Sequence, residues 1–115
     1  MLSVYVNGEP VEVPANIGID QEDGLISPLH THDDTGEIHV EAPEPEEFTL
    51  GQLFTEWDVE LTDTCIADYC TDDRNGLVVY VDGKPTDGDP NDIVLEDGQE
   101  ITVWHGPDDA RPFGR

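Results

Sequence analysis

The stretch LHTHDDTGEIHVE, residues 29–41, concentrates the residues of this chain that are best suited to binding a metal. It holds three of the chain's four histidines, His30, His32 and His39. Three imidazoles with an open fourth position suit zinc or copper. A shared ion requires the chain to fold back between His32 and His39, so the intervening residues decide whether a site can form.

The sequence DDTG at residues 33–36 predicts this reversal, because it reads as a turn between two strands. Side chains alternate along a strand, and a two- or four-residue loop places even positions opposite odd ones. One face of the hairpin then holds His30, His32, Glu37, His39 and Glu41. The other face, which we expect on the core, holds Leu29, Thr31, Ile38 and Val40.

Directly opposed residues have Cβ atoms about 4.5 to 5.5 Å apart, which lets the three imidazoles converge on one ion. We therefore predict a zinc or copper site at His30, His32 and His39, with Glu37 closing the shell or orienting a bound water. The alternative is a solvent-facing hairpin on which the histidines are ordinary polar residues.

A second acidic stretch, DGDPND, imitates the first half of a calcium loop with Asp87, Asp89 and Asn91. Asp92 stands where such a loop requires glycine, and Gly98 stands where it requires glutamate. We therefore predict a solvated acidic turn. The chain shows neither a serine, histidine and acid set nor a glycine-rich phosphate loop.

The two cysteines, Cys65 and Cys70, have a spacing that fits neither zinc ribbons nor redox motifs. A local disulfide across a turn and a pair of reduced thiols are both open, because the compartment is not encoded here. As soft metal ligands, two thiols alone are a weak signal.

Turn and capping signals define the elements around this segment. VYVNGEP at residues 4–10 returns as VYVDGKP at residues 79–85, and each predicts a hairpin with a two-residue turn. A third Asp-Gly turn, at residues 97–98, separates a strand-like stretch from a final strand in which Ile101 and Val103 face one way. The two long hairpins open the two ends of the domain.

FTLGQLFTEW predicts one short helix that begins near Leu50, because Thr49 and Gln52 form a capping box. Its apolar face holds Leu50, Leu53, Phe54 and Trp57. Gly51 costs this helix about 1 kcal/mol relative to alanine, so packing on a sheet must stabilise it.

The order of these elements predicts an α+β fold of the ubiquitin-like β-grasp type, a mixed sheet packed on one helix, with a histidine-bearing hairpin as an insertion. A chain of 115 residues is long enough for one domain. We divide it into a first hairpin, the insertion, the helix, the C-terminal strands and a tail, at residues 1–14, 15–47, 48–58, 77–105 and 106–115.

Three families resemble parts of this sequence. DGDPNDIVLEDGQEITVWHG is similar to the end of small β-grasp sulfur carriers, but those end in Gly-Gly and this chain ends in ARPFGR, so the likeness implies the fold and not the activity. HTHDDTGE resembles the HxHx4E opening of cupins, which would make His30, His32 and Glu37 ligands. The glycine expected next is Glu44 and the second cupin motif is missing, so a metal-dependent cupin-like enzyme is a lesser alternative.

SPLHTHDDTGEIHVEAP, FTLGQLF and the two hairpin motifs together resemble a little-characterised family of prokaryotic domains. The likeness covers nearly the whole chain. The family implies no established reaction, so whether this chain is an enzyme stays open. The main alternative to metal binding is a metal-free β-grasp module that binds another protein through a sheet face or edge.

The chain is strongly acidic, with 28 acidic residues against four basic ones and a formal net charge of −24. Proteins of salt-accumulating halophiles have such surfaces, and high salt screens the repulsion. Mimicry of nucleic acid is the alternative. Direct nucleic-acid binding is not expected, because no basic patch exists. With neither a membrane span nor a signal peptide in the sequence, we expect a cytoplasmic protein.

Overall fold

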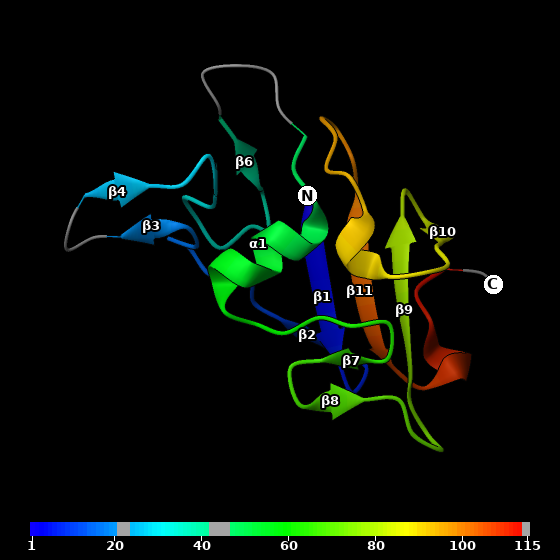
Figure 1. Ribbon diagram of the computed structural model, residues 1–115. Helices are drawn as coiled ribbons and strands as arrows, with labels where there is room; N and C mark the ends of the chain where they lie inside the picture. Colours follow the sequence, from blue (N-terminus) through cyan, green and yellow to red (C-terminus); the bar gives the residue numbers. More distant parts are fainter. Residues whose placement is uncertain (21–23, 42–46, 114–115) are drawn as a thin grey trace.

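The computed structural model describes residues 1–20, 24–41 and 47–113 and shows an α+β architecture, as predicted (Figure 1). A five-stranded mixed sheet has the strand order β10-β9-β11-β1-β2. Its central strands, β1 and β11, are parallel, and the other neighbours are antiparallel. The strands are β1 (Leu2–Val6), β2 (Glu9–Val11), β9 (Gly76–Val81), β10 (Lys84–Pro85) and β11 (Ile101–Gly106).

Both predicted Asn-Gly and Asp-Gly hairpins are confirmed. Asn7 and Gly8 join β1 to β2 with φ of 53° and 78°, and Asp82 and Gly83 join β9 to β10 with φ of 53° and 80°. Positive φ at both central residues gives the type I′ turn, whose twist matches that of the flanking strands. These turns fix the register of the two outer strand pairs.

The strand-like stretch before the third turn does not form the predicted strand. Residues 93–95 instead run alongside residues 48–50, which lead into the helix. Leu50 N–H donates to the Ile93 carbonyl at 2.8 Å, and Leu95 N–H donates to the Phe48 carbonyl at 2.8 Å. An isolated bridge between Thr49 and Val94 is the only strand-type pairing described for this stretch. Because β11 is paired on both sides, with β9 and with β1, this stretch bonds instead to the residues that begin the helix.

The helix α1 (Leu50–Trp57) begins where the capping signal predicts. Gln52 N–H donates to Thr49 Oγ1 at 3.3 Å, and Thr49 N–H donates to Gln52 Oε1 at 2.7 Å. The helix ends at Asp58, whose φ of 61° turns the backbone out of the helical path, and Val59 N–H donates to the Phe54 carbonyl at 3.0 Å across this end.

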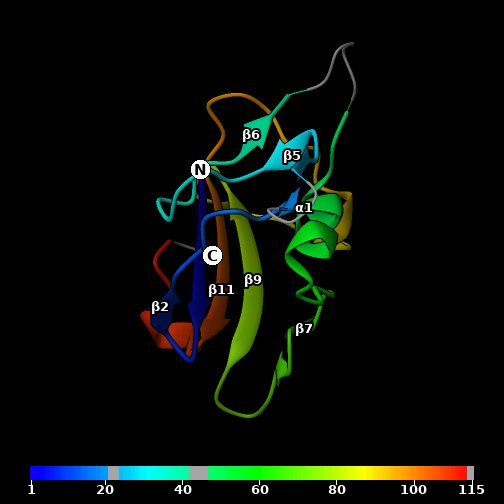
Figure 2. The ribbon, with the colours of Figure 1, turned by 90° about the vertical axis from the view of Figure 1, so that its left-hand side faces the viewer.

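Two layers cover the sheet on opposite faces. Figure 2 shows the sheet nearly edge-on, with α1 on one side and the C-terminal segment containing the 3-10 helix η2 (Asp108–Ala110) on the other. Ile101 and Val103 of β11 belong to the core beneath α1, whereas the Tyr80 ring packs against Phe113 with centroids 5.2 Å apart. Every residue of β11 is consequently buried. The core beneath the helix includes Leu2, Val4, Leu29, Leu50, Leu53, Phe54 and Val103.

Three short hairpins complete the described structure. They pair β3 (Ile19–Asp20) with β4 (Leu25–Ile26), β5 (Leu29–His30) with β6 (His39–Val40), and β7 (Cys65–Ile66) with β8 (Tyr69–Cys70). β5 lies against α1, so the hairpin with the histidines is attached to the core. Within the described parts of the chain, no helix is both long and apolar enough to cross a membrane.

The cysteines form a disulfide between the opposed residues Cys65 and Cys70 of β7 and β8. The buried His105 joins this hairpin to the first one, because its Nδ1 accepts from Asn7 N–H at 3.1 Å and its Nε2 faces the Cys70 carbonyl at 3.0 Å. A carbonyl only accepts, so Nε2 carries the proton. Neither the two sulfurs nor His105 is free to bind a metal.

Candidate metal centre

The β5–β6 hairpin has the register that the alternation argument predicts. His30 pairs with His39 and Leu29 pairs with Val40. Glu41 N–H donates to the Pro28 carbonyl at 2.7 Å, which continues the same register by one position. His30 and His39 therefore stand directly opposite each other, with ring centroids 5.5 Å apart and nearly parallel planes.

The two strands separate after His30, so the hairpin is shorter than predicted. Thr31 N–H donates to the Ile17 carbonyl at 3.1 Å, and the Gly36 carbonyl accepts from Leu2 N–H at 2.7 Å. Each side of the turn is thus bonded to another part of the chain. Gly36 has a φ of 86°, and a Cβ there would collide with the Leu2 carbonyl oxygen, so this attachment requires glycine.

The separated segment keeps a compact turn at DDTG. Asp33 accepts hydrogen bonds from the Thr35 hydroxyl at 2.6 Å and from the Thr35 amide at 3.2 Å. These two bonds hold the pKa of the Asp33 carboxyl below its usual value of 3.8, and the bond from the hydroxyl has the larger effect. The nearby His39 and His32 lower this pKa as well. The turn carries His32 back beside the other two histidines, with its ring 4.7 Å from that of His30 and 4.6 Å from that of His39.

His30, His32, His39 and Glu41 form the candidate centre, each offering one ligand atom within 4.8 Å of the others. His30 Nε2 lies 3.1 Å from His32 Nε2 and 3.3 Å from Glu41 Oε1, and His39 Nδ1 lies 3.8 Å from Glu41 Oε1. A tetrahedral zinc with bonds of about 2.0–2.1 Å separates its ligand atoms by about 3.3 Å. The four groups, with all their ligand atoms within 4.8 Å of one another, could therefore hold one metal ion.

His30 is held in the orientation that a metal ligand needs. Its side chain is almost fully buried, and its Nδ1 lies 2.7 Å from the Ser27 carbonyl. Because that carbonyl can only accept, Nδ1 carries the proton and Nε2 presents a lone pair to the centre. Ser27 is itself tied to the helix, since its hydroxyl donates to Glu56 Oε1 at 3.0 Å.

Glu37, predicted as the fourth ligand, is not brought into this group. Its side chain is exposed and lies beyond the point where the strands separate, so it no longer stands opposite His32. Glu41 takes the place instead, because its bond to Pro28 keeps it in register two residues after His39. The alternation pattern put both Glu37 and Glu41 on the histidine face, so it marked Glu41 as a candidate without choosing between the two.

The two faces of the hairpin also differ from the prediction. Leu29 and Thr31 are buried, as expected, but Val40 is 45% exposed. His30 is buried instead of facing solvent, with 2% of its surface exposed. A histidine that is merely a polar surface residue would not be enclosed in this way. The burial of His30 therefore argues against a solvent-facing hairpin on which the histidines are ordinary polar residues.

The cupin alternative does not fit this structure. Its HxHx4E motif would use Glu37, which lies outside the group of ligands. The described sheet is an open five-stranded mixed sheet with β2 and β10 at its edges, whereas a cupin is a closed double-sheet fold. The shared letters therefore do not carry the cupin site over to this chain.

The calcium-like stretch is a structural turn, as predicted. Asp89 caps the 3-10 helix η1 (Pro90–Asp92) by accepting from Asn91 N–H at 2.9 Å. The Asn91 amide group donates to the Leu61 carbonyl at 2.6 Å. These side chains are occupied in joining η1 to the loop after α1, and no metal-ligand group is found among the described residues of this stretch.

Comparison of the chain with protein-family models, curated proteins and solved structures found no match. The resemblances noted above therefore rest on motifs of the sequence alone. The geometry of the candidate centre carries the functional assignment.

Proposed function

We propose that this chain is a metal-binding domain that holds zinc or copper through His30, His32, His39 and Glu41. The observation that carries the proposal is the convergence of three imidazole nitrogens and one carboxylate oxygen within 4.8 Å. Imidazole is a borderline ligand that suits zinc and copper, while calcium and magnesium prefer sites made of oxygen. The donor set supports a transition metal.

The position of the site supports an exchangeable ion, as sensing or delivery requires. His30 anchors the centre in the interior, but the side chains of His39 and Glu41 are 30% and 66% exposed. Solvent can therefore reach the ion from one side, and ligands can leave without unfolding the core. A bound ion would also tie β5 to β6 and so support the segment before α1.

We further propose that the fold is a ubiquitin-like β-grasp. The parallel pair β1/β11, with β2 outside β1, the β9–β10 hairpin outside β11 and one helix over the sheet, supports this assignment. Membership of the little-characterised prokaryotic family with the LHTHD and FTLGQ motifs is part of the same proposal, and the near full-length motif pattern supports it.

Calorimetric titration of the protein with zinc and with copper(II), in molar salt, tests the proposal. The parent should bind one ion per chain, and the triple His30→Ala, His32→Ala, His39→Ala variant should bind none while keeping its circular dichroism spectrum. Affinity should fall as the pH is lowered, because protons compete with the ion for imidazole nitrogen. A parent that binds neither metal would favour the metal-free interaction module.

Two glutamates of the same segment provide a matched pair of variants. Glu41→Gln should weaken binding on the order of tenfold or more, since it removes a charged oxygen ligand. Glu37→Gln changes the net charge by the same amount outside the group and should leave the affinity nearly unchanged. Equal losses in the two variants would mean that the overall negative charge, and not a built site, attracts the ion.

A further inference from the structure

β9 is an unprotected edge over half its length. β10 is only two residues long, and the last backbone bond on this side runs from Thr86 N–H to the Val79 carbonyl at 2.9 Å. Bonding positions alternate along a strand, so Leu77 turns its N–H and C=O to the same open side as Val79. In the described part of the chain, neither group of Leu77 has a partner on that side.

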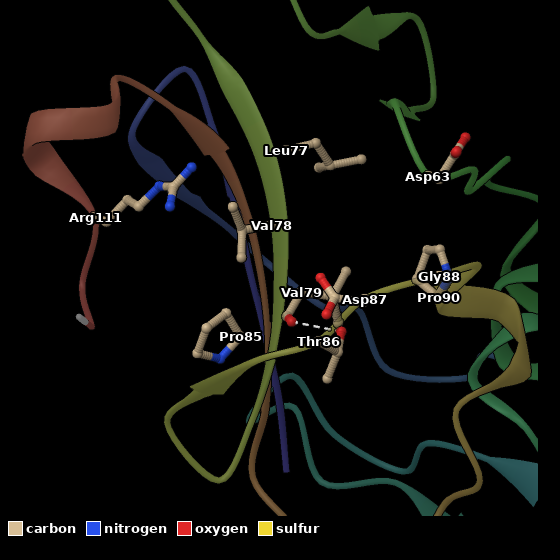
Figure 3. A pocket seen from close by; sticks show the side chains of 10 residues that line it. All are labelled: Asp63, Leu77, Val78, Val79, Pro85, Thr86, Asp87, Gly88, Pro90 and Arg111. Atoms are coloured by element: carbon tan, nitrogen blue, oxygen red, sulfur yellow. Dashed lines mark hydrogen bonds between the residues drawn. The ribbon is translucent and has the colours of Figure 1, made fainter. Parts of the chain in front are cut away.

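A groove of about 270 Å³ runs along this edge (Figure 3). Figure 3 shows Leu77, Asp63 and Asp87 on one side of β9 and Val78 and Arg111 on the other. Unpaired backbone groups beside a groove are the features that bind an extended peptide as an added strand.

The charges of the groove differ on its two sides. The carboxylates of Asp63 and Asp87 have no ion-pair partner in the described structure. A residue of an added strand opposite Leu77 would project to the same side as Leu77, toward these carboxylates. Its two neighbours would project to the other side, toward Val78, where the guanidinium of Arg111 is already paired with Asp108 and no free carboxylate of the described residues lines the groove to attract a cation.

We infer that the groove beside Leu77 binds a short extended segment of a partner protein in which one lysine or arginine lies between two apolar residues. The central cation would face Asp63 and Asp87, and the apolar neighbours would cover Val78. The backbone of the segment would bond to the N–H and C=O of Leu77. A second copy of this chain is a poorer occupant, because two molecules each carrying a net charge of −24 repel one another.

The probe for this inference is the capped pentapeptide Thr-Val-Lys-Val-Thr, added to the ¹⁵N-labelled protein in the lowest salt at which it stays folded. We expect the largest shift and the strongest slowing of hydrogen exchange at the Leu77 amide. A peptide with glutamate in place of lysine should bind about tenfold more weakly or worse, and so should one N-methylated at the lysine, which loses a backbone donor. Because the N-methylated peptide is tested on the unchanged protein, its weaker binding cannot come from misfolding of the protein.

Two charge-reversal variants distinguish binding of the peptide in the groove from general attraction between the cationic peptide and the acidic protein. Asp63→Lys should weaken binding about tenfold, whereas Glu9→Lys, on the opposite edge strand β2, changes the net charge equally and should have little effect. Equal effects of the two variants, or shifts spread over the surface without protection of Leu77, would overturn the inference. So would sedimentation of the protein alone as a dimer that Leu77→Pro dissociates, since the edge would then belong to a second copy.

Discussion

At the scale of single residues, the two buried histidines differ in the hydrogen-bond partners of their ring nitrogens. His30 and His105 are each 2% exposed. Both ring nitrogens of His105 are engaged with backbone groups of Asn7 and Cys70. His30 uses one nitrogen for the Ser27 carbonyl and directs the other toward His32 and Glu41. Burial alone therefore does not mark a histidine as a possible ligand, whereas a ring nitrogen directed toward other metal-ligand groups, as in His30, does.

His105→Ala should destabilise the fold without removing the metal. The change leaves a buried cavity, Asn7 N–H without an acceptor and the Cys70 carbonyl without a donor, which costs about 2 kcal/mol or more in the free energy of unfolding. Urea denaturation measures that loss, and zinc titration of the folded variant should give the affinity of the parent. Loss of zinc binding with unchanged stability would place His105 in the site and contradict its structural role.

Asp72 provides a test by titration. The amides of Arg74 and Asn75 each donate to its carboxylate at 2.8 Å, and they hold its pKa below the usual value of 3.8. The bonds stabilise the turn before β9 fully above pH 3.8, and this contribution is lost as the pH falls through the lower folded value. Carboxyl-carbon chemical shifts should show a midpoint below 3.8. A midpoint at or above that value would mean that the turn does not form these bonds in solution.

At the scale of elements, the sequence predicted the parts that short-range chemistry determines. The turns at Asn7 and Asp82 and the cap at Thr49 depend on neighbours a few residues away, and they form as predicted. The register that sets His30 opposite His39 also follows from strand alternation and the polar turn.

The parts that failed depend on distant partners. Glu37 lost its place because Ile17 and Leu2 bind the two sides of the hairpin before it can lengthen. The stretch around Val94, predicted as a strand, instead bonds to the residues that begin the helix, since both sides of β11 are paired with other strands. No local pattern announces such competition, so the exchange of Glu37 for Glu41 could not be read from spacing alone.

Gly51→Ala should lower the stability of the fold, which is the opposite of the usual effect of this change in a helix. Alanine in place of glycine ordinarily stabilises a helix by about 1 kcal/mol. Here a Cβ at Gly51 would lie 2.7 Å from Asn91 Cβ and 3.0 Å from the Asn91 carbonyl oxygen, so η1 would have to move. We expect a net loss of about 1–2 kcal/mol in the free energy of unfolding, measured by urea denaturation. A gain in stability would show that η1 does not pack closely on α1.

At the scale of the whole molecule, negative charge is the dominant property. The four basic residues cannot balance 28 acidic ones. The described ion pairs include one arginine pair, Arg111 with Asp108 at 2.6 Å. Crowding is visible at Glu12, where a hydrogen bond and the charge of Asp34 raise the pKa of the carboxyl. Screening by salt should therefore act on the protein as a whole.

The melting temperature should rise steeply from low salt to molar potassium chloride if the acidity is an adaptation to salt. At about 1 M salt the Debye length is roughly 3 Å, so repulsion among separated carboxylates is largely removed. Thermal unfolding followed by circular dichroism measures this, with metal-free protein so that ion binding does not contribute. A melting temperature that is flat or falls over this range would favour mimicry of nucleic acid as the reason for the acidity.

X-ray absorption of the zinc-loaded protein tests the metal centre most directly, because it reports the ligands themselves. His30, His32, His39 and Glu41 predict three imidazole nitrogens and one carboxylate oxygen at about 2.0–2.1 Å from the metal. The spectrum of Glu37→Gln should be identical, and that of His39→Ala should lose one imidazole. A spectrum of the parent with fewer than three imidazoles, or one that His39→Ala leaves unchanged, would contradict the proposed centre.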